Sequence, residues 1–422
     1  MQSLNLIKPE RTLFFMKFSH LADCHIGSWK EEKLNNISTE AFIKALDISV
    51  SENVDFILIA GDIFNTALPA IEKLKAATKK LREIKEKEIP VYIIPGSHDF
   101  SPTGKTMLDV LEHAGLVINV MKGTITQENK LRLKFTINQK TGAKITGILG
   151  KKGSLEKNYY EHLDTRAIEE EPGFKIFMFH SAIAELKPAE LEKMEAAPAS
   201  FLPKGCGYYA GGHVHIVKAA TLDGYKNIVY PGPLFPNNFA ELEKLGNGGF
   251  YIYTDGDVKY VPIIIHPTIV IWKEAKQQTP QEIEQQLLKE IENRDLTNAI
   301  VTIRISGELR EGKTSDINFK LIKEVLEQRG AYFVMKNTNL LKAKEFEEIV
   351  IKGDNTADIE QKVIQEHSGQ FQSEILSKEE QQQLTETLLH ILNTEKQEGE
   401  RVVDFENRLR KDVESVFKTR EE

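Results

Sequence analysis

Five apolar runs in the first half of this chain each end in an aspartate or a histidine. The runs suit buried strands of a parallel sheet, because they are short, rich in β-branched and aromatic residues, and bounded by Gly or Pro. The clearest run leads into Gly96-Ser97-His98-Asp99. The others lead into Asp23-Cys24-His25, Gly61-Asp62, His180 and His213-Val214-His215. The runs alternate with helical stretches, which predicts an α/β fold with the five strands in one sheet.

The polar residues at these strand ends predict a metal site. Strands of one α/β sheet bring their carboxyl ends to a common edge, where ligands bind. Carboxylate and imidazole together suit Mn²⁺, Fe²⁺ or Zn²⁺. One such residue alone is more often a helix cap or a hydrogen-bonded loop residue, but a whole set in one unit favours ligands. The set is Asp23, His25, Asp62, His98, His180, His213 and His215. Because these residues are too many for one ion, we expect two ions roughly 3.5–4 Å apart that share a carboxylate, an arrangement suited to phosphoryl chemistry.

The formal net charge of −8 argues at first against a nucleic-acid partner, since proteins usually meet this polyanion with a basic surface. The charge is unevenly distributed. Residues 351–422 hold 17 acidic and 10 basic side chains, a net −7, so residues 1–350 carry about −1. Bound divalent ions add positive charge to a near-neutral body. Net charge therefore does not exclude DNA.

The two cysteines, Cys24 and Cys206, indicate a reducing compartment and no disulfide framework. Cys24 stands between two expected ligands and, by strand alternation, points away from them, so we predict a packed small residue and not a nucleophile. The longest apolar run, residues 260–272, is interrupted by proline and histidine and is shorter than the roughly 20 residues that a membrane span needs. We expect a cytoplasmic protein with no membrane contact.

The patterns divide the chain into four parts. Residues 1–15 are an N-terminal extension, and residues 16–266 contain all the motifs. Residues 267–350 alternate strands and helices without an Asp or His cluster, which predicts a small α+β capping domain. Residues 351–422 predict a helical tail.

Smaller elements follow from the same patterns. We expect helices over residues 39–52, from Pro69 onward and over residues 188–194. Residues 117–150 contain short strands, which we expect to be antiparallel additions to the sheet. In the tail, Ser377 and Glu380 fit a capping box. Because the tail is too small for a core of its own, it should dock on the body of the chain or on a partner's helices.

The motifs resemble a known family. Asp23-Cys24-His25, Gly61-Asp62, Gly96-Ser97-His98-Asp99, His180 and Gly212-His213-Val214-His215 look like the five motifs of the calcineurin-like metallophosphoesterases. Gly61-Asp62-Ile63-Phe64, Tyr230-Pro231-Gly232-Pro233 and His266-Pro267, with the small domain and tail, narrow the resemblance to SbcD-type DNA double-strand-break repair nucleases, the meiotic-recombination-eleven family in its archaeal form. The resemblance implies a sandwich of sheets with helices outside as the nuclease domain, a capping domain and a partner-docking tail.

The resemblance also implies a role for each site residue. One metal is held by Asp23, His25 and His215. The other is held by His180 and His213, and Asp62 bridges the two ions. His98 is the catalytic histidine, which protonates the leaving oxygen or stabilises the transition state, and Asp99 orients its ring. The implied cofactors are two Mn²⁺ ions.

One position departs from the family. Its third motif usually reads Gly-Asn-His-Asp, with the Asn amide oxygen on the second metal, whereas this chain has Ser97. A neutral hydroxyl is a weaker ligand that acts directly, through a water, or not at all, so we expect looser binding of the second ion. Asn65 stands where some members carry a histidine that contacts DNA, which bears on exonuclease preference.

The implied partners are DNA, a second copy of the chain, and an SMC-like ABC-type ATPase of the SbcC type that binds the C-terminal helices. The implied location is the cytoplasmic nucleoid. Met107, Leu108 and Leu111 are candidates for the dimer seam, with a role in the core as the alternative.

The expected function is a Mn²⁺-dependent exonuclease or endonuclease subunit of a double-strand-break repair complex, which hydrolyses phosphodiester bonds by a two-metal mechanism. Two alternatives stay open. One is a phosphodiesterase of the same fold that acts on a small nucleotide. The other is a structural, DNA-tethering subunit whose catalysis is weakened, which Ser97 motivates.

Overall fold

The computed structural model describes residues 15–100, 106–151, 157–191, 194–343, 377–392, 394 and 402–418. The described residues fall into two compact units. The first runs to Val270 and also includes Thr297–Thr302 and Gly330–Met335, and the second contains the rest. The N-terminal extension lies outside the described residues except for Phe15, and so does much of the tail before Ser377.

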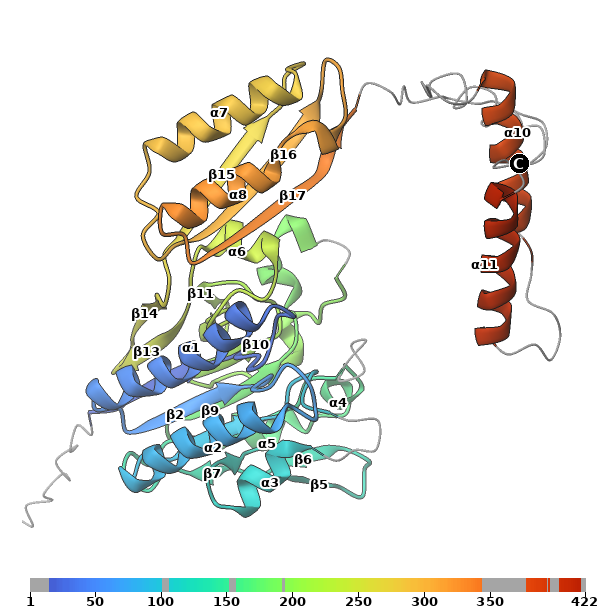
Figure 1. Ribbon diagram of the computed structural model, residues 1–422. Helices are drawn as coiled ribbons and strands as arrows, with labels where there is room; N and C mark the ends of the chain where they lie inside the picture. Colours follow the sequence, from blue (N-terminus) through green and yellow to red (C-terminus); the bar gives the residue numbers. More distant parts are fainter. Residues whose placement is uncertain are drawn as a thin grey trace, which may run out of the picture. The chain divides into compact units, whose positions relative to one another are not determined.

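The first unit contains two six-stranded sheets (Figure 1). The first sheet has parallel neighbours β1 to β4 and an antiparallel edge made by β13 and β14. Its strands, in spatial order, are β14 (Asp257–Ile263), β13 (Gly248–Thr254), β1 (Lys17–Leu21), β2 (Phe56–Ala60), β3 (Val91–Ile94) and β4 (Ile118–Asn119). Its helices are α1 (Glu32–Ser51), α2 (Ile71–Glu86) and α3 (Met107–His113).

The second sheet is built around four parallel strands, with an antiparallel strand at each edge. Its strands, in spatial order, are β11 (Lys218–Leu222), β12 (Tyr225–Tyr230), β10 (Tyr208–Gly212), β9 (Lys175–His180), β8 (Lys144–Gly147) and β7 (Thr136–Ile137). A separate hairpin pairs β5 (Gly123–Ile125) with β6 (Leu131–Leu133). Three short helices complete the unit: α4 (Lys157–Glu161), α5 (Thr165–Glu169) and α6 (Phe239–Leu245).

Alternation along the strands explains why the sheets stack. In β2, Phe56 and Leu58 face the layer between the sheets, while Ile57 and Ile59 face the helices. A strand buried on both faces has no polar side to expose, which is typical of a parallel sheet covered on both sides. Burying each large apolar side chain contributes roughly 1.5–3 kcal/mol. The result is a sandwich of two sheets with helices outside, which confirms the architecture that the resemblance implies.

Several expectations about the elements were wrong. The motif strands lie in two sheets, because the β-α-β pattern gives strand type but not which parallel strands pair. In residues 117–150, β4 and β8 are parallel to their neighbours β3 and β9, so the additions are not all antiparallel. α1 begins at Glu32 and not near residue 39. Where a helix was expected over residues 188–194, the described residues form only a 3₁₀ turn, Ala189–Leu191.

The predicted dimer seam on α3 is also corrected. Leu108 and Leu111 are buried in the core between the first sheet and its helices, and Met107 packs against the same core. Leu108 and Leu111 therefore fill the alternative role, since a buried side chain is not available to a partner.

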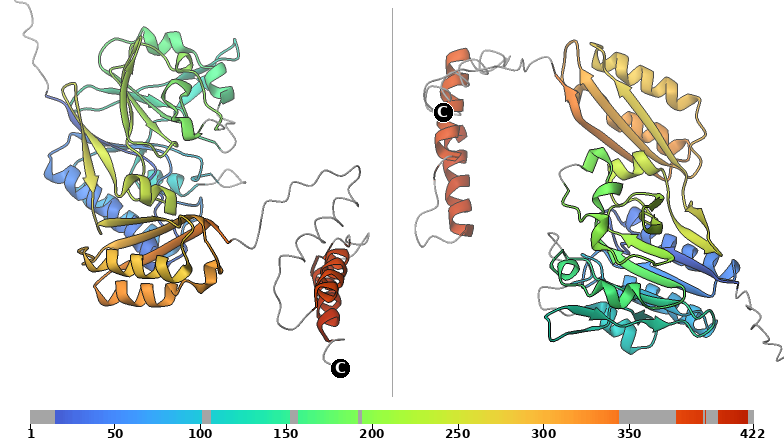
Figure 2. Two further views of the ribbon diagram at one scale, coloured as in Figure 1. Left: turned by 90° about the horizontal axis from the view of Figure 1, so that it is seen from above. Right: turned by 180° about the vertical axis from the view of Figure 1, so that it is seen from behind.

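The greater part of a three-stranded sheet belongs to the second unit, and its strands are β15 (Thr268–Glu274), β16 (Ile300–Glu308) and β17 (Phe333–Lys342). Figure 2 shows α7 (Pro280–Glu292) and α8 (Phe319–Gln328) on one face of this sheet. Thr279 and Glu282 form a capping box that starts α7, with Pro280 in its first turn.

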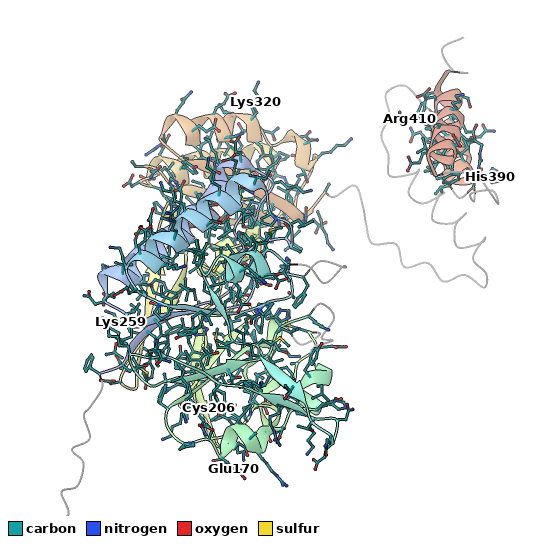
Figure 3. All side chains as sticks on the ribbon, turned by 90° about the horizontal axis from the view of Figure 1, so that it is seen from below. Glu170, Cys206, Lys259, Lys320, His390 and Arg410 are labelled. Carbon is teal, nitrogen blue, oxygen red and sulfur yellow. The ribbon has the colours of Figure 1, made fainter. Side chains whose placement is uncertain are left out.

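The described part of the tail consists of α10 (Lys378–Leu392) and α11 (Val402–Lys418), which contact each other. Figure 3 marks His390 on α10 and Arg410 on α11. The Glu380 carboxylate accepts hydrogen bonds from the backbone N–H and hydroxyl of Ser377, which confirms the capping box. Among the described residues, no helix is both long and apolar enough to cross a membrane.

Candidate metal centre

The residues predicted from the strand ends meet at one edge of the sandwich. β1 leads into Asp23 and His25, β2 into Asp62 and β3 into His98, all in the first sheet. The second sheet contributes His180 as the last residue of β9, and His213 and His215 after β10. Within the described residues, three groups have ligand atoms within 4.8 Å of one another. They are Asp23, His25 and His215; His25, Asp62 and His98; and Asp23, Asp62 and His180.

Asp62 occupies the centre of this cluster. Its Oδ1 accepts a hydrogen bond from the backbone N–H of His98 at 2.7 Å. Its Oδ2 lies 3.1 Å from Nε2 of His180 and 3.7 Å from Nε2 of His25. Oδ1 therefore holds the turn at His98, whereas Oδ2 faces one histidine from each sheet.

Hydrogen bonds to three of the rings fix which nitrogen faces the cluster. Nδ1 of His180 lies 2.8 Å from the carbonyl oxygen of Ala60, and Nδ1 of His98 lies 2.8 Å from that of Asn65. Nδ1 of His215 lies 3.0 Å from a carboxylate oxygen of Glu241. Because these oxygens only accept, each Nδ1 carries the proton, and each Nε2 is left for a metal or a substrate.

Glu241 is the residue that the sequence analysis missed. It belongs to α6, 26 positions after His215, and its side chain lies beside that histidine. An asparagine cap followed three residues later by glutamate is a local helix signal, and nothing in it points to a distant histidine. His215 and Glu241 are also among the residues that line a pocket of about 570 Å³.

Backbone strain is concentrated at the site. Five of its residues have positive φ values: Asp23 (49°), His25 (41°), Asp62 (53°), His213 (90°) and His215 (52°). Such conformations are unfavourable for residues with a Cβ and persist where surrounding contacts enforce them, commonly at functional sites. Backbone bonds between the two loops supply this constraint, from Asp23 N–H to the Gly61 carbonyl and from His25 N–H to the Asp62 carbonyl.

Glycine is required at two positions beside the cluster. Gly61 has φ +85°, and a Cβ there would lie 2.2 Å from Nδ1 of His180. A Cβ on Gly96 would lie 2.2 Å from Oδ1 of Asp62. Both glycines therefore allow a close approach of backbone to ligand side chains.

The cluster is electrostatically coupled. Burial disfavours a charged His180, but the negative charge of Asp62 and its hydrogen bond raise the His180 pKa to about 10. Burial likewise raises the pKa of Asp62, yet His180 outweighs it and holds that pKa below its usual range. A proton on His180 thus neutralises the Asp62 carboxylate, and a divalent cation that takes this place must displace the proton.

The remaining expected ligands lie close to the cluster. The His213 ring centroid is 5.2 Å from that of His180, and burial and the charge of His180 lower the His213 pKa to about 4. The backbone N–H of His213 donates to both carboxylate oxygens of Asp23. Ser97 donates its hydroxyl to Oδ2 of Asp62 at 3.3 Å.

The expected role of Asp99 is wrong. Its carboxylate accepts hydrogen bonds from the backbone N–H groups of Asp62 and Gly96, at 2.9 and 2.8 Å. The ring of His98 is held by the carbonyl of Asn65 instead. Asp99 therefore supports the two motif turns, and it is an Asn65 backbone group that orients the histidine.

Cys24 behaves as predicted. It is wholly buried in the core between the first sheet and its helices, and burial raises its pKa well above the ordinary thiol value. A buried, protonated thiol is a packing group and a poor nucleophile.

The donor set fits divalent transition-metal ions. Two buried carboxylates and several imidazoles converge, and the Nε2 atoms of His25 and His215 face each other at 3.0 Å. Mixed carboxylate and imidazole ligands of this kind suit Mn²⁺, Fe²⁺ or Zn²⁺.

Comparison with known proteins agrees with this site. The profile of the calcineurin-like phosphoesterase family matches residues 16–217, which include the five motifs from Asp23 to His215. The chain carries a calcineurin-like phosphoesterase domain. It is also similar to the DNA double-strand break repair protein Mre11 of several archaea, among them Archaeoglobus fulgidus, at 28% identity over 54% of this chain and 52% of that protein.

Two further relatives carry the same name. The Methanococcus maripaludis protein is 25% identical over 56% of this chain and 62% of its own length. The Saccharolobus solfataricus protein is 25% identical over 73% of this chain and 74% of its own. The chain thus spans about half to three fifths of the first relatives it matches. The matched region includes the phosphoesterase domain.

Proposed function

We propose that this protein is a DNA nuclease subunit of a double-strand-break repair complex that uses two divalent metal ions, both Mn²⁺. The observation that carries the proposal is the buried cluster in which Oδ2 of Asp62 faces ligands from both sheets. In addition, the archaeal relatives are named as double-strand break repair proteins.

The residues divide into two ligand sets around Asp62. Asp23, His25 and His215 form one set, since their ligand atoms lie together. His180 and His213 form the other, with Ser97 beside them through its hydroxyl on Asp62. Two bound divalent ions supply the positive charge that in-line displacement at a phosphodiester needs.

His98 is the proposed proton donor. Its ring contacts that of His25, with centroids 4.8 Å apart, so it lies at the cluster without being buried among the other ligands. Because Nδ1 is committed to the Asn65 carbonyl, Nε2 is the atom that can give a proton to the leaving oxygen. Asp99 maintains the turn that presents the ring.

The proposed partners follow the resemblance. The amphipathic α10 and α11 suit docking on the coiled coil of an SMC-like ABC-type ATPase of the SbcC type, and a second copy of the chain completes a homodimer. The proposed location is the nucleoid. With Leu108 and Leu111 in the core, the dimer contact must use other residues.

The deciding experiment is cleavage of labelled single- and double-stranded DNA with added Mn²⁺. The His98→Ala variant should lose cleavage by on the order of 10²–10⁴-fold, the usual contribution of a general acid. His113→Ala, which removes an exposed histidine from α3, is the matched control and should cleave normally.

Other outcomes separate the alternatives. Hydrolysis of small nucleotide diesters without cleavage of long DNA would favour a small-nucleotide phosphodiesterase. DNA binding without cleavage across a wide range of Mn²⁺ concentration would favour a tethering subunit, the role that Ser97 motivates. Cleavage of DNA that survives His98→Ala would contradict the assigned proton donor.

A further inference from the structure

We propose that Glu241 is a positioning residue that aims His215 at the metal centre and thereby sets the affinity of one of the two metal sites. This inference rests on the proposed metal-dependent function, and its test does not require DNA cleavage.

The contact itself is direct. Oε1 of Glu241 lies 3.0 Å from Nδ1 of His215, and the side chains of both residues are about four-fifths buried. A carboxylate only accepts, so the pair fixes the proton on Nδ1. Nε2 of His215 is then left with a lone pair, 3.0 Å from Nε2 of His25 and 3.8 Å from Oδ1 of Asp23. Carboxylates that hold metal-binding histidines in this way fix the ring and make it a better ligand.

The carboxylate is itself held in place. Its Oε1 also accepts from the side-chain amide of Asn238, and its Oε2 accepts from the backbone N–H of Asn237. Both oxygens of Glu241 therefore have partners, and the group cannot rotate without losing several hydrogen bonds. The Asn238 side-chain oxygen caps α6 by accepting from the N–H of Glu241, which fixes the backbone as well.

The Nδ1 partner of His215 differs in kind from those of His180 and His98. The Nδ1 atoms of His180 and His98 lie against backbone carbonyls, that of Ala60 at the end of β2 and that of Asn65 in the loop after β2. His215 instead lies three residues beyond the end of β10, in a left-handed conformation, and its Nδ1 is paired with a side chain. A single substitution can remove this partner, whereas it cannot remove a carbonyl.

The test is a titration of the full, metal-free chain with Mn²⁺, followed by the electron paramagnetic resonance signal of the free ion. Wild-type protein should bind two ions. Glu241→Gln should weaken one site by about 10- to 100-fold and leave the other unchanged, the usual effect of removing such a partner. An amide nitrogen cannot replace the lost oxygen, because the groups around Glu241 are donors.

Two controls make the result specific. Glu128→Gln removes the same charge from the exposed turn between β5 and β6 and should bind Mn²⁺ as the wild type does. Asn238→Ala removes the α6 cap and one of the hydrogen bonds to the Glu241 carboxylate but keeps the carboxylate itself, so it should weaken Mn²⁺ binding less than Glu241→Gln does. If it weakens Mn²⁺ binding as much as Glu241→Gln does, the helix and not the carboxylate is responsible, and the proposal is wrong.

Thermal melting without metal verifies that each variant is folded. Equal Mn²⁺ affinity of folded Glu241→Gln and Glu128→Gln proteins would overturn the proposal. A change in substrate KM at unchanged metal affinity would also overturn it, since Glu241 would then contact substrate through the pocket. If the protein binds Mn²⁺ with the expected difference but cleaves no DNA, the nuclease proposal fails and the role of Glu241 stands.

Discussion

The pKa of a buried histidine is shifted in opposite directions in the middle and at the edge of the layer between the two sheets. His20, on β1 in the middle, is wholly buried, and its Nδ1 lies 3.0 Å from the hydroxyl of Tyr208. Burial lowers its pKa to about 3. His180, at the end of β9, is equally buried but lies beside Asp62, and its pKa is raised to about 10. Burial alone gives an inert neutral ring, whereas a carboxylate at the strand end creates a cation site.

Removing the Asp62 carboxylate should give His180 a low pKa like that of His20. In Asp62→Ala, we expect DNA cleavage to fall by on the order of 10³-fold or more, because the variant lacks the carboxylate that we propose both ions share. The pKa of His180 should drop below its ordinary value, as in His20, and the ring proton shifts in a pH titration by NMR would report it. A His180 pKa that stays high without Asp62 would show that Asp23 is the dominant partner.

A methyl group added at Gly61, beside His180, should weaken the metal centre without changing any charge. Gly61→Ala places a methyl group against the His180 ring in a left-handed backbone conformation. We expect a loss of about 1–3 kcal/mol in the free energy of unfolding, together with weaker Mn²⁺ binding. The matched control is Gly142→Ala, whose φ of +71° is similar but where no atom lies within 4 Å of the added Cβ. Equal Mn²⁺ affinities of the two variants would show that the His180 ring tolerates displacement.

The two histidines should also give opposite pH dependence of stability. The folded His20 pKa of about 3 lies below its ordinary 6.5, so the unfolded chain binds the proton first as pH falls. The contribution of His20 to the free energy of unfolding is fully present above pH 6.5 and is lost as the pH falls toward 3, by about 1.4 kcal/mol per pH unit. His180 contributes in the other direction, fully below pH 6.5 and decreasingly as pH rises toward 10.

His20→Gln tests the middle of the layer alone. The variant keeps a group able to bond Tyr208 but cannot titrate, so the acid loss of stability between pH 7 and 5 should shrink relative to the wild type. Urea unfolding at both pH values measures the difference. Identical slopes would mean that the unfolded chain does not protonate His20 in this range.

The smallest expected effect is at Ser97. Its hydroxyl bonds Asp62, and the longer Ser97→Asn side chain places an amide oxygen, a better metal ligand, in this turn. We expect Mn²⁺ to bind the weaker site more tightly, by up to roughly tenfold, or about 1.4 kcal/mol. Calorimetric titration compares Ser97→Asn with Ser97→Ala, and affinities no tighter than wild type would contradict the expectation.

Much of the site could be predicted from the sequence because its information is local. Asp23, Asp62 and His98 each follow an apolar run directly, and parallel strands deliver such residues to one edge by geometry alone. The same logic placed Cys24 away from the ligands, in the core. The capping box at Ser377 was predictable for a similar reason, since its partner is three residues away.

Features that depend on contacts between residues far apart in the chain could not be predicted from the sequence. The division of the motif strands between two sheets, the partner of the His98 ring and the contact of Glu241 with His215 all join segments far apart in the chain. The apolar runs show where each strand ends and therefore which residues stand at its carboxyl end. They do not fix which strands pair or which loop meets which, because those choices follow from the packing of whole layers. The residues that gather at the site therefore follow from the sequence, whereas the packing of the two sheets determines the contacts that hold each of them.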